Sequence, residues 1–219
     1  MIMGVTMNEI SILLIEDHDL TRMGLRTELH SHSGFKVIGE AANATVGLKL
    51  LETMKPDVAV IDIGLPDMDG IELTRKFRRY QAETGQSQTK VLILTMDNTE
   101  DAVLAAFAAG ADSYYRKEIS MNKFTEAVQV TFRGNSWIDP AIADVVLRKM
   151  RPRPDDDQSL VQSKTLKIEY PLSQRELEIL ELIVAGCSHG KIAETLYITV
   201  GTVKTHVRNI LNKLCAYSG

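Results

Sequence analysis

Five polar residues with complementary chemistry follow apolar runs of the chain: Glu16, Asp17, Asp62, Thr95 and Lys117. A carboxylate can attack phosphorus, while a hydroxyl group and an ammonium group can stabilise the phosphoryl oxygens. Clustered carboxylates repel one another, and Mg²⁺ relieves that repulsion because it takes oxygen ligands and bridges carboxylates to phosphate. This residue set predicts magnesium-assisted transfer of a phosphoryl group to Asp62.

The apolar runs before these residues are expected to be strands of one sheet. Three runs are apolar almost throughout, as in strands buried on both faces, and two more are weaker candidates: Ile10–Ile15, Val58–Ile63, Val91–Leu94, Phe35–Gly39 and Ser113–Arg116. Helical patterns separate them, which predicts a doubly wound α/β domain with a five-stranded parallel sheet over residues 8–134. Ligand sites of such sheets lie at the carboxyl ends of the strands, so the five polar residues should converge there.

The motifs in this region resemble the receiver domain of response regulators. They are Ile-Glu-Asp at 15–17, the run Asp-Ile-Gly-Leu-Pro-Asp-Met-Asp-Gly at 62–70, Thr95, Tyr114 and Lys117. The resemblance covers roughly residues 10–133 and implies a flavodoxin-like fold. It also implies that a sensor histidine kinase supplies the phosphoryl group to Asp62.

The same resemblance implies roles for the remaining site residues. The metal set is Glu16, Asp17, Asp62 and the backbone carbonyl of Gly64. Lys117 binds the phosphoryl group, the Thr95 hydroxyl moves towards it, and the Tyr114 ring swings inward. An acidic run at 67–69 superficially suggests a calcium loop, but it lacks the other ligands, and Asp69 is expected to cap the following helix instead.

The C-terminal part of the chain has no strand signal. Residues 135–171 are expected to be a linker with a short helix from Pro140, and the proline-rich, charged segment Arg151–Gln158 is its most linker-like part. A small all-α domain is expected over residues 172–219. Its helices are expected from a capping box at Ser173 and Glu176 to Gly186, over Lys191–Leu196, and over Thr199–Cys215.

The last of these helices is basic, although the chain as a whole carries a net charge of −4. Its expected apolar stripe is Val203, Val207, Ile210 and Leu214. The segment from Leu172 to Leu214 resembles the helix-turn-helix of LuxR-type regulators, and with a receiver it points to the NarL/FixJ class. We expect Lys204, Thr205 and Arg208 near base edges, and Thr202, His206 and Lys213 at phosphates.

The sequence departs from that family pattern in two places. His189 and Gly190 stand where the family has a polar or basic pair, so one phosphate contact is expected to be missing. The family has a further helix after the recognition helix, whereas this sequence stops at Gly219. Either the sequence is truncated at this end or DNA binding is compromised.

The expected function is a two-component response regulator whose phosphorylation controls DNA binding and transcription. Expected partners are the kinase, double-stranded DNA, a second copy of the phosphorylated chain and RNA polymerase, with no membrane. Two cysteines, Cys187 and Cys215, suit a reducing cytoplasm.

Two alternatives remain open beside that function. A phosphotransferase acting on a separate substrate would require a second, acid-base carboxylate at the position of Gly64. It would also require a longer loop to cover the substrate. The chain is therefore not expected to be an enzyme, beyond phosphorylating or dephosphorylating itself. A regulator controlled by protein contact alone would not need the complete polar set.

Overall fold

The computed structural model describes residues 9–85, 89–96, 99–118, 121–138, 140–150 and 172–217. The chain divides into two compact units, Met1–Asn98 with Ala109–Trp137, and Thr99–Ala108 with Ile138–Gly219. The expected linker segment Arg151–Gln158 lies outside the described residues, as do the side chains of Leu214 and Cys215.

The first unit is built on a five-stranded parallel sheet in the order β2-β1-β3-β4-β5. The strands are β1 (Ile10–Ile15), β2 (Phe35–Ala41), β3 (Val58–Asp62), β4 (Lys90–Thr95) and β5 (Ser113–Arg116). This is the strand order of the flavodoxin-like doubly wound fold, which confirms the expected architecture.

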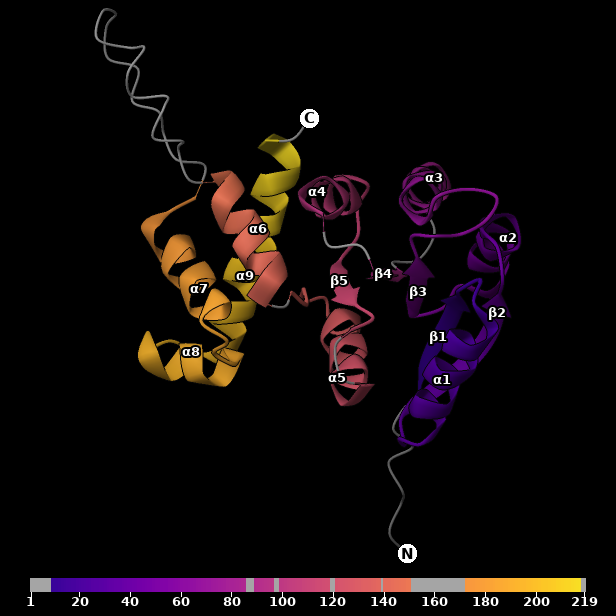
Figure 1. The fold of residues 1–219 in the computed structure, drawn as a ribbon, viewed down its shortest axis with the longest axis horizontal. Helices are drawn as coiled ribbons and strands as arrows, with labels where there is room; N and C mark the ends of the chain where they lie inside the picture. The colour runs from indigo at the N-terminus through magenta and orange to yellow at the C-terminus, as the bar shows by residue number, and fades with distance from the viewer. Residues whose placement is uncertain are drawn as a thin grey trace, which may run out of the picture. The chain divides into compact units, whose positions relative to one another are not determined.

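Helices cover both faces of this sheet, which explains why its strands are apolar almost throughout (Figure 1). On one face, α1 (Asp19–His30) and α5 (Met121–Phe132) bury residues such as Leu29 and Phe124 against the strands. The other face carries α2 (Ala44–Met54) and α3 (Gly70–Thr84).

Short connections hold the polar residues at the carboxyl ends of the strands. His18 caps α1 by accepting a hydrogen bond from the Thr21 amide, so Glu16 and Asp17 occupy the brief turn between β1 and α1. Asp69 caps α3 by accepting from the Ile71 amide, which confirms the expected role of this carboxylate.

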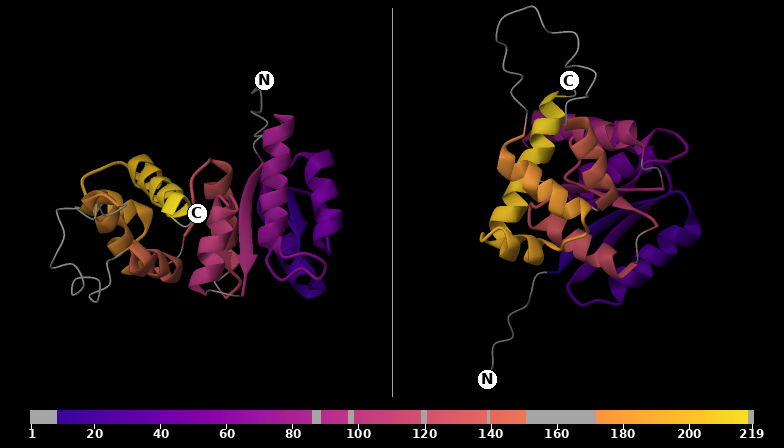
Figure 2. Two further views of the ribbon diagram at one scale, coloured as in Figure 1. Left: turned by 90° about the horizontal axis from the view of Figure 1, so that it is seen from above. Right: turned by 60° about the vertical axis from the view of Figure 1, so that its left-hand side comes forward.

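The regular elements that the structure describes in the second unit are helices: α4 (Glu100–Ala108), α6 (Pro140–Met150), α7 (Gln174–Val184), α8 (His189–Thr195) and α9 (Val200–Tyr217). The two views of Figure 2 show these helices from other directions. The expected capping box forms between Ser173 and Glu176, and Gly186 follows α7 with a φ of 80°. In the part of the chain that the structure describes, no helix is both long and apolar enough to cross a membrane.

The last helix buries the expected stripe and one residue more. Val203, Val207 and Ile210 are fully buried, and Leu211, which the stripe did not include, is 4% exposed. The helix also continues two residues past its expected end, to Tyr217. The buried side chains fix which face of α9 remains available to a partner.

Candidate functional site

Three carboxylates from two strand ends meet in one cluster. Glu16 and Asp17 follow β1, Asp62 ends β3, and one oxygen of each lies within 4.8 Å of the others. Glu16 and Asp62 are buried, whereas Asp17 is exposed. The cluster therefore combines acidic groups in the interior with one acidic group open to solvent.

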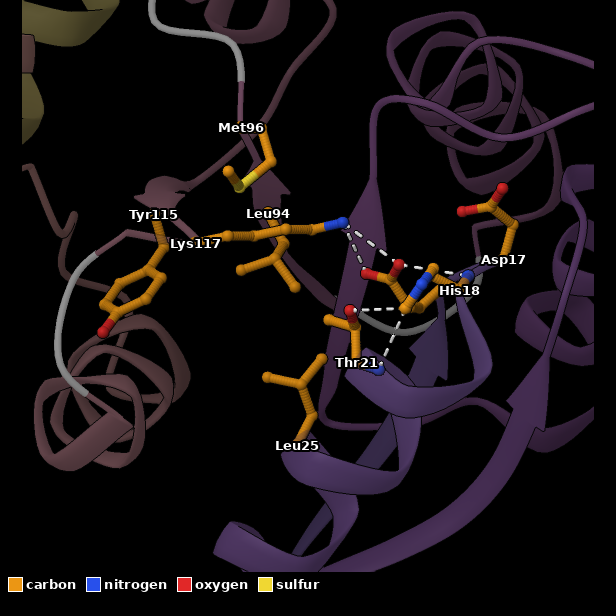
Figure 3. A pocket seen from close by; sticks show the side chains of 9 residues that line it. Asp17, His18, Thr21, Leu25, Leu94, Met96, Tyr115 and Lys117 are labelled. Atoms are coloured by element: carbon orange, nitrogen blue, oxygen red, sulfur yellow. Dashed lines mark hydrogen bonds and ion pairs between the residues drawn. The ribbon is translucent and has the colours of Figure 1, made fainter.

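Lys117 joins the two buried carboxylates. Its Nζ lies 2.8 Å from Glu16 Oε2 and 3.0 Å from Asp62 Oδ2. Figure 3 shows the Lys117 side chain extended across the pocket, with Asp17 beyond its amino group. The Lys117 backbone amide also donates to the Thr95 carbonyl at 2.8 Å, which ties the end of β4 to the base of this lysine.

Burial and mutual attraction act in opposite directions on these charges. Burial and the neighbouring Asp62 raise the pKa of Glu16 and outweigh the opposing effect of Lys117. Burial lowers the pKa of Lys117, but its contacts with Glu16 and Asp62 prevail and raise the pKa above its usual value. The lysine is therefore held as a cation beside Asp62.

The donor set fits a hard divalent cation. Glu16 Oε2 is buried beside the Lys117 ammonium at 2.8 Å and makes no further hydrogen bond, so it retains a lone pair that could ligate a cation. Carboxylate oxygens from Glu16, Asp17 and Asp62 are within reach of one another, which suits an ion that prefers oxygen ligands. Repulsion among the carboxylates would fall when such an ion binds.

The remaining predicted site residues occupy the same end of the sheet at different depths. Thr95 ends β4 and is 2% exposed, and Gly64 lies two residues beyond Asp62. Tyr114 is fully buried within β5, three residues before Lys117. Glu16, Asp17, Asp62 and Lys117 thus lie together, while Tyr114 is buried in the core.

Gly70 is required by the close approach of α3 to the end of β3. A Cβ atom at this position would lie 2.0 Å from the carbonyl oxygen of Asp62, so the backbone at Asp62 would have to move. The glycine therefore protects the position of Asp62 as well as the start of α3.

Replacing Gly70 with alanine should lower the free energy of unfolding by about 1–3 kcal/mol, the usual cost of overpacking. Gly64→Ala is the matched control, because its Cβ would meet Asp62 Oδ2 at an ordinary 3.6 Å. Urea unfolding followed by far-ultraviolet circular dichroism measures both. Equal stability of the two variants would contradict the steric explanation.

A pocket of about 450 Å³ adjoins the acidic cluster. Its walls include residues that the sequence analysis did not single out: His18, Thr21, Leu25, Leu94, Met96 and Tyr115. The only sequence signal for them is position, since His18 follows Asp17 and Met96 follows Thr95. Figure 3 shows how these side chains surround the pocket.

The predicted DNA-contacting residues share α9. Thr205 and Arg208 are exposed, and Lys204 and His206 are half-buried. Thr202 hydrogen-bonds through its hydroxyl to Thr199 at 2.8 Å, next to the beginning of the helix. The exposed face thus carries cations and hydroxyl groups, opposite the stripe that packs into the domain.

Lys213 is the exception among the predicted contacts, because it forms an ion pair within its own domain. Its Nζ lies 2.7 Å from Oε2 of Glu176, whose side chain is 4% exposed. Burial raises the pKa of Glu176, but hydrogen bonds from Lys213 and Ser173 prevail and lower it. On α8, burial and the nearby Lys204 lower the pKa of His189.

Lys213→Ala should destabilise the C-terminal unit by about 1 kcal/mol at neutral pH, since it leaves a buried carboxylate without its cation. The expected loss of stability is small because the Lys213 side chain is 42% exposed, and solvent screens its interaction with Glu176. A lowered carboxylate pKa contributes stability above the unfolded-state value, and that contribution disappears as pH falls through the folded-state value. The wild type should therefore lose more stability than the variant on acidification below about pH 4.5.

Hydrogen exchange of the α7 and α9 amides measures this effect separately from the first unit. Lys191→Ala is the control, because that lysine pairs with Glu194 on the surface, with both side chains more than 60% exposed. If the α7 and α9 amides are as well protected from exchange in Lys213→Ala as in the control variant, the ion pair contributes nothing to stability.

Comparison with known proteins places both halves of the chain. Residues 12–129 match the family model described as the response regulator receiver domain, and residues 170–218 match that of the bacterial regulatory proteins of the luxR family. The chain is 37% identical to the response regulator protein VraR of Staphylococcus aureus strain Mu3, over 94% of this chain and 90% of that protein.

Solved structures give the same result. The response regulator ChrA of a heme-sensing two-component system is 34% identical and covers 94% of this chain and 90% of its own, with a TM-score of 0.52. The two-component response regulator RcsB, in a structure with DNA, has the same fold at 20% identity, covers 95% of this chain and 93% of its own, and has a TM-score of 0.57.

Proposed function

Because this chain belongs to the response regulators that join a receiver domain to a LuxR-type DNA-binding domain, we propose that Asp62 is its phosphoacceptor. A receiver domain implies a sensor histidine kinase as partner, and such a regulator is not a conventional enzyme. The observation that carries the assignment is the contact of Lys117 with both buried carboxylates, Glu16 and Asp62. Of these two, only Asp62 ends a central strand of the sheet.

In the proposed reaction, a carboxylate oxygen of Asp62 bonds to the phosphorus of a phosphohistidine. The bond from phosphorus to the imidazole nitrogen breaks, and its electron pair stays with the imidazole. Lys117 is already beside Asp62 and can pair with the arriving phosphoryl oxygens. We assign Thr95, at the end of β4, as the hydroxyl donor to the same group, and Tyr114 as the residue whose packing responds.

Receiver domains generally use Mg²⁺, and we propose that it binds here to Asp17, Asp62 and the backbone carbonyl of Gly64, with Glu16 nearby. The ion supplies neutralisation of negative charge on the phosphoryl oxygens. The support is the acidic cluster, in which the buried Glu16 Oε2 pairs with Lys117 and makes no further hydrogen bond. Self-phosphorylation by small donors and self-dephosphorylation would use these same residues.

For the output, we propose that residues 8–134 form the receiver, 135–171 the connection with α6, and 172–219 the DNA-binding domain. Lys204, Thr205 and Arg208 would lie near base edges, with Thr202, His206 and Lys213 at phosphates. The exposed Thr205 and Arg208 and the half-buried Lys204 on α9 support this arrangement. Phosphorylation would favour a homodimer, with RNA polymerase as a further partner, in the cytoplasm where a bacterial regulator meets its DNA.

Incubating the full chain with acetyl phosphate and Mg²⁺, followed by intact mass spectrometry, tests the proposed function. We expect a gain of one phosphoryl group that alkali and neutral hydroxylamine remove, as expected of an aspartyl phosphate. A parallel sample with a chelator should gain little, because the acidic cluster then repels the donor. Unchanged mass in the presence of Mg²⁺ would contradict the proposal.

A further inference from the structure

Asp67 lies in the loop between β3 and α3, and both of its carboxylate oxygens accept hydrogen bonds from the first residues of α2. Oδ1 accepts from the Ala44 amide at 2.8 Å, and Oδ2 accepts from the Thr45 amide at 2.9 Å and from the Thr45 hydroxyl. The hydroxyl and the two amides lower the pKa of Asp67 to about 2. The carboxylate is therefore ionised, and able to accept all three bonds, at any physiological pH.

The helix that Asp67 contacts also has a cap of its own. The first amides of a helix have no partner within the helix, and Asn43 accepts a hydrogen bond from one of them, the Val46 amide, at 2.9 Å. The amides of Ala44 and Thr45 are satisfied instead by Asp67, from a loop more than 20 positions away in the sequence. Asp67 thus ties the loop to α2 as well as capping the helix.

The loop is also held at its base, next to β3. The Ile63 carbonyl accepts hydrogen bonds from the Leu65 amide at 2.9 Å and from the Gly70 amide at 3.0 Å. Gly64 lies between this base and Asp67 in the chain. Its backbone is therefore fixed on one side by the bonds to Ile63 and on the other by the bonds from Asp67 to α2.

Helix α2 is a firm support for the loop because it packs closely on β1. Gly47 lets α2 lie directly against Ile15, since an added Cβ would come within 2.7 Å of Ile15 Cδ1. Ile15 is the last residue of β1, and Glu16 and Asp17 follow it. Asp67 therefore connects the loop after β3 to a helix seated on the strand that carries two of the three clustered carboxylates.

From these contacts we propose that Asp67 is a positioning residue for the metal site, holding the loop so that the Gly64 carbonyl stays available to a divalent cation. The inference rests on the proposed role of that carbonyl as a ligand of Mg²⁺. Groups that orient metal ligands affect metal affinity although they do not touch the ion. Because such coupling is reciprocal, a bound ion should strengthen the bonds of Asp67 to α2 by the same factor.

The first test is a Mg²⁺ titration of the full chain at 0.15 M KCl, followed by the amide signals in NMR spectra. Asp67→Asn should raise the Kd for Mg²⁺ by about tenfold, the lower end of the effect of residues that orient ligands. Asparagine offers one acceptor oxygen in place of two, and its amino group would face a backbone N–H.

Two variants control for helix capping and for charge. Asn43→Ala removes the other cap of α2 but leaves the loop tied to the helix, so its Kd should stay within about twofold of the wild type. Asp69→Asn removes the same charge from the same loop and retains a side chain that can cap α3, so its Kd should also stay close to the wild-type value.

The second test uses hydrogen exchange and needs no variant. Saturating Mg²⁺ should slow exchange of the Ala44 and Thr45 amides by about tenfold, because the coupling acts equally in both directions. The Val46 amide, which donates to Asn43, should change much less. In Asp67→Asn, the ion should leave the exchange of all three amides unaltered.

The outcomes separate this inference from the proposed function. A wild-type Kd in Asp67→Asn would overturn the inference, as would equal weakening in Asn43→Ala or in Asp69→Asn, which would assign the effect to helix capping or to charge. Exchange of the Ala44 and Thr45 amides that does not respond to Mg²⁺ in the wild type would also overturn it. Failure of the wild type to bind Mg²⁺ at all would overturn the proposed metal site itself, before any variant is compared.

Discussion

Replacing Asp62 with asparagine should abolish the mass gain of one phosphoryl group. The amide of asparagine is uncharged and is a far weaker nucleophile than a carboxylate, so the bond to phosphorus does not form. The variant should remain folded, because Glu16 remains as a partner for Lys117 at 2.8 Å. The expected effect is complete loss rather than slowing, since the nucleophilic carboxylate itself is removed while Lys117 and Glu16 stay in place.

Asp69→Asn is the matched control for this experiment. Asp69 lies seven residues further along and caps α3 by accepting a hydrogen bond from the Ile71 amide at 2.6 Å. Asparagine is as good a helix cap as aspartate, so stability and phosphorylation should both be retained. Undiminished phosphorylation of Asp62→Asn would move the acceptor to another carboxylate, and peptide mapping of the borohydride-reduced protein would locate it.

The central sheet was predictable because its strands are buried on both faces. A continuous apolar run predicted β1 with the bounds that the structure has, and the weaker candidate Ser113–Arg116 also matches β5. The expected end of β2 was wrong by two residues. Glu40 and Ala41 continue the strand because they pair with Leu14 and Ile15 of β1. The polar Glu40 interrupts the apolar pattern, so the sequence alone did not indicate this pairing.

The meeting of Glu16, Asp17 and Asp62 was also predictable, because a parallel sheet brings the carboxyl ends of its strands to one edge. The contact between Lys117 and Glu16 was not, since it joins residues 101 positions apart and depends on side-chain conformation. The ion pair of Glu176 with Lys213 is similar. A capping box identifies Glu176 from local spacing, but nothing local shows that α9 returns to cover it.

Removal of both Lys204 and Arg208 should have the largest effect on DNA binding. The two residues lie four apart on α9, so they share one face of the helix, opposite the buried Val203, Val207 and Ile210. Each base-reading contact contributes about 1–3 kcal/mol, so the double alanine variant should lose about 2–6 kcal/mol of binding free energy on a selected duplex. The buried stripe is unchanged, and the helix should remain folded.

The measurement uses a duplex selected by the phosphorylated full chain from a randomised pool, and an unselected duplex of the same length. If these two residues read base edges, the double variant loses most of its preference for the selected duplex. If they touch only phosphates, both duplexes weaken alike and the slope of log affinity against log salt falls by about two. Lys191→Ala removes a lysine from α8 that pairs with Glu194, and it should leave the preference intact. Wild-type affinity and preference in the double variant would place the DNA-reading surface elsewhere than on α9.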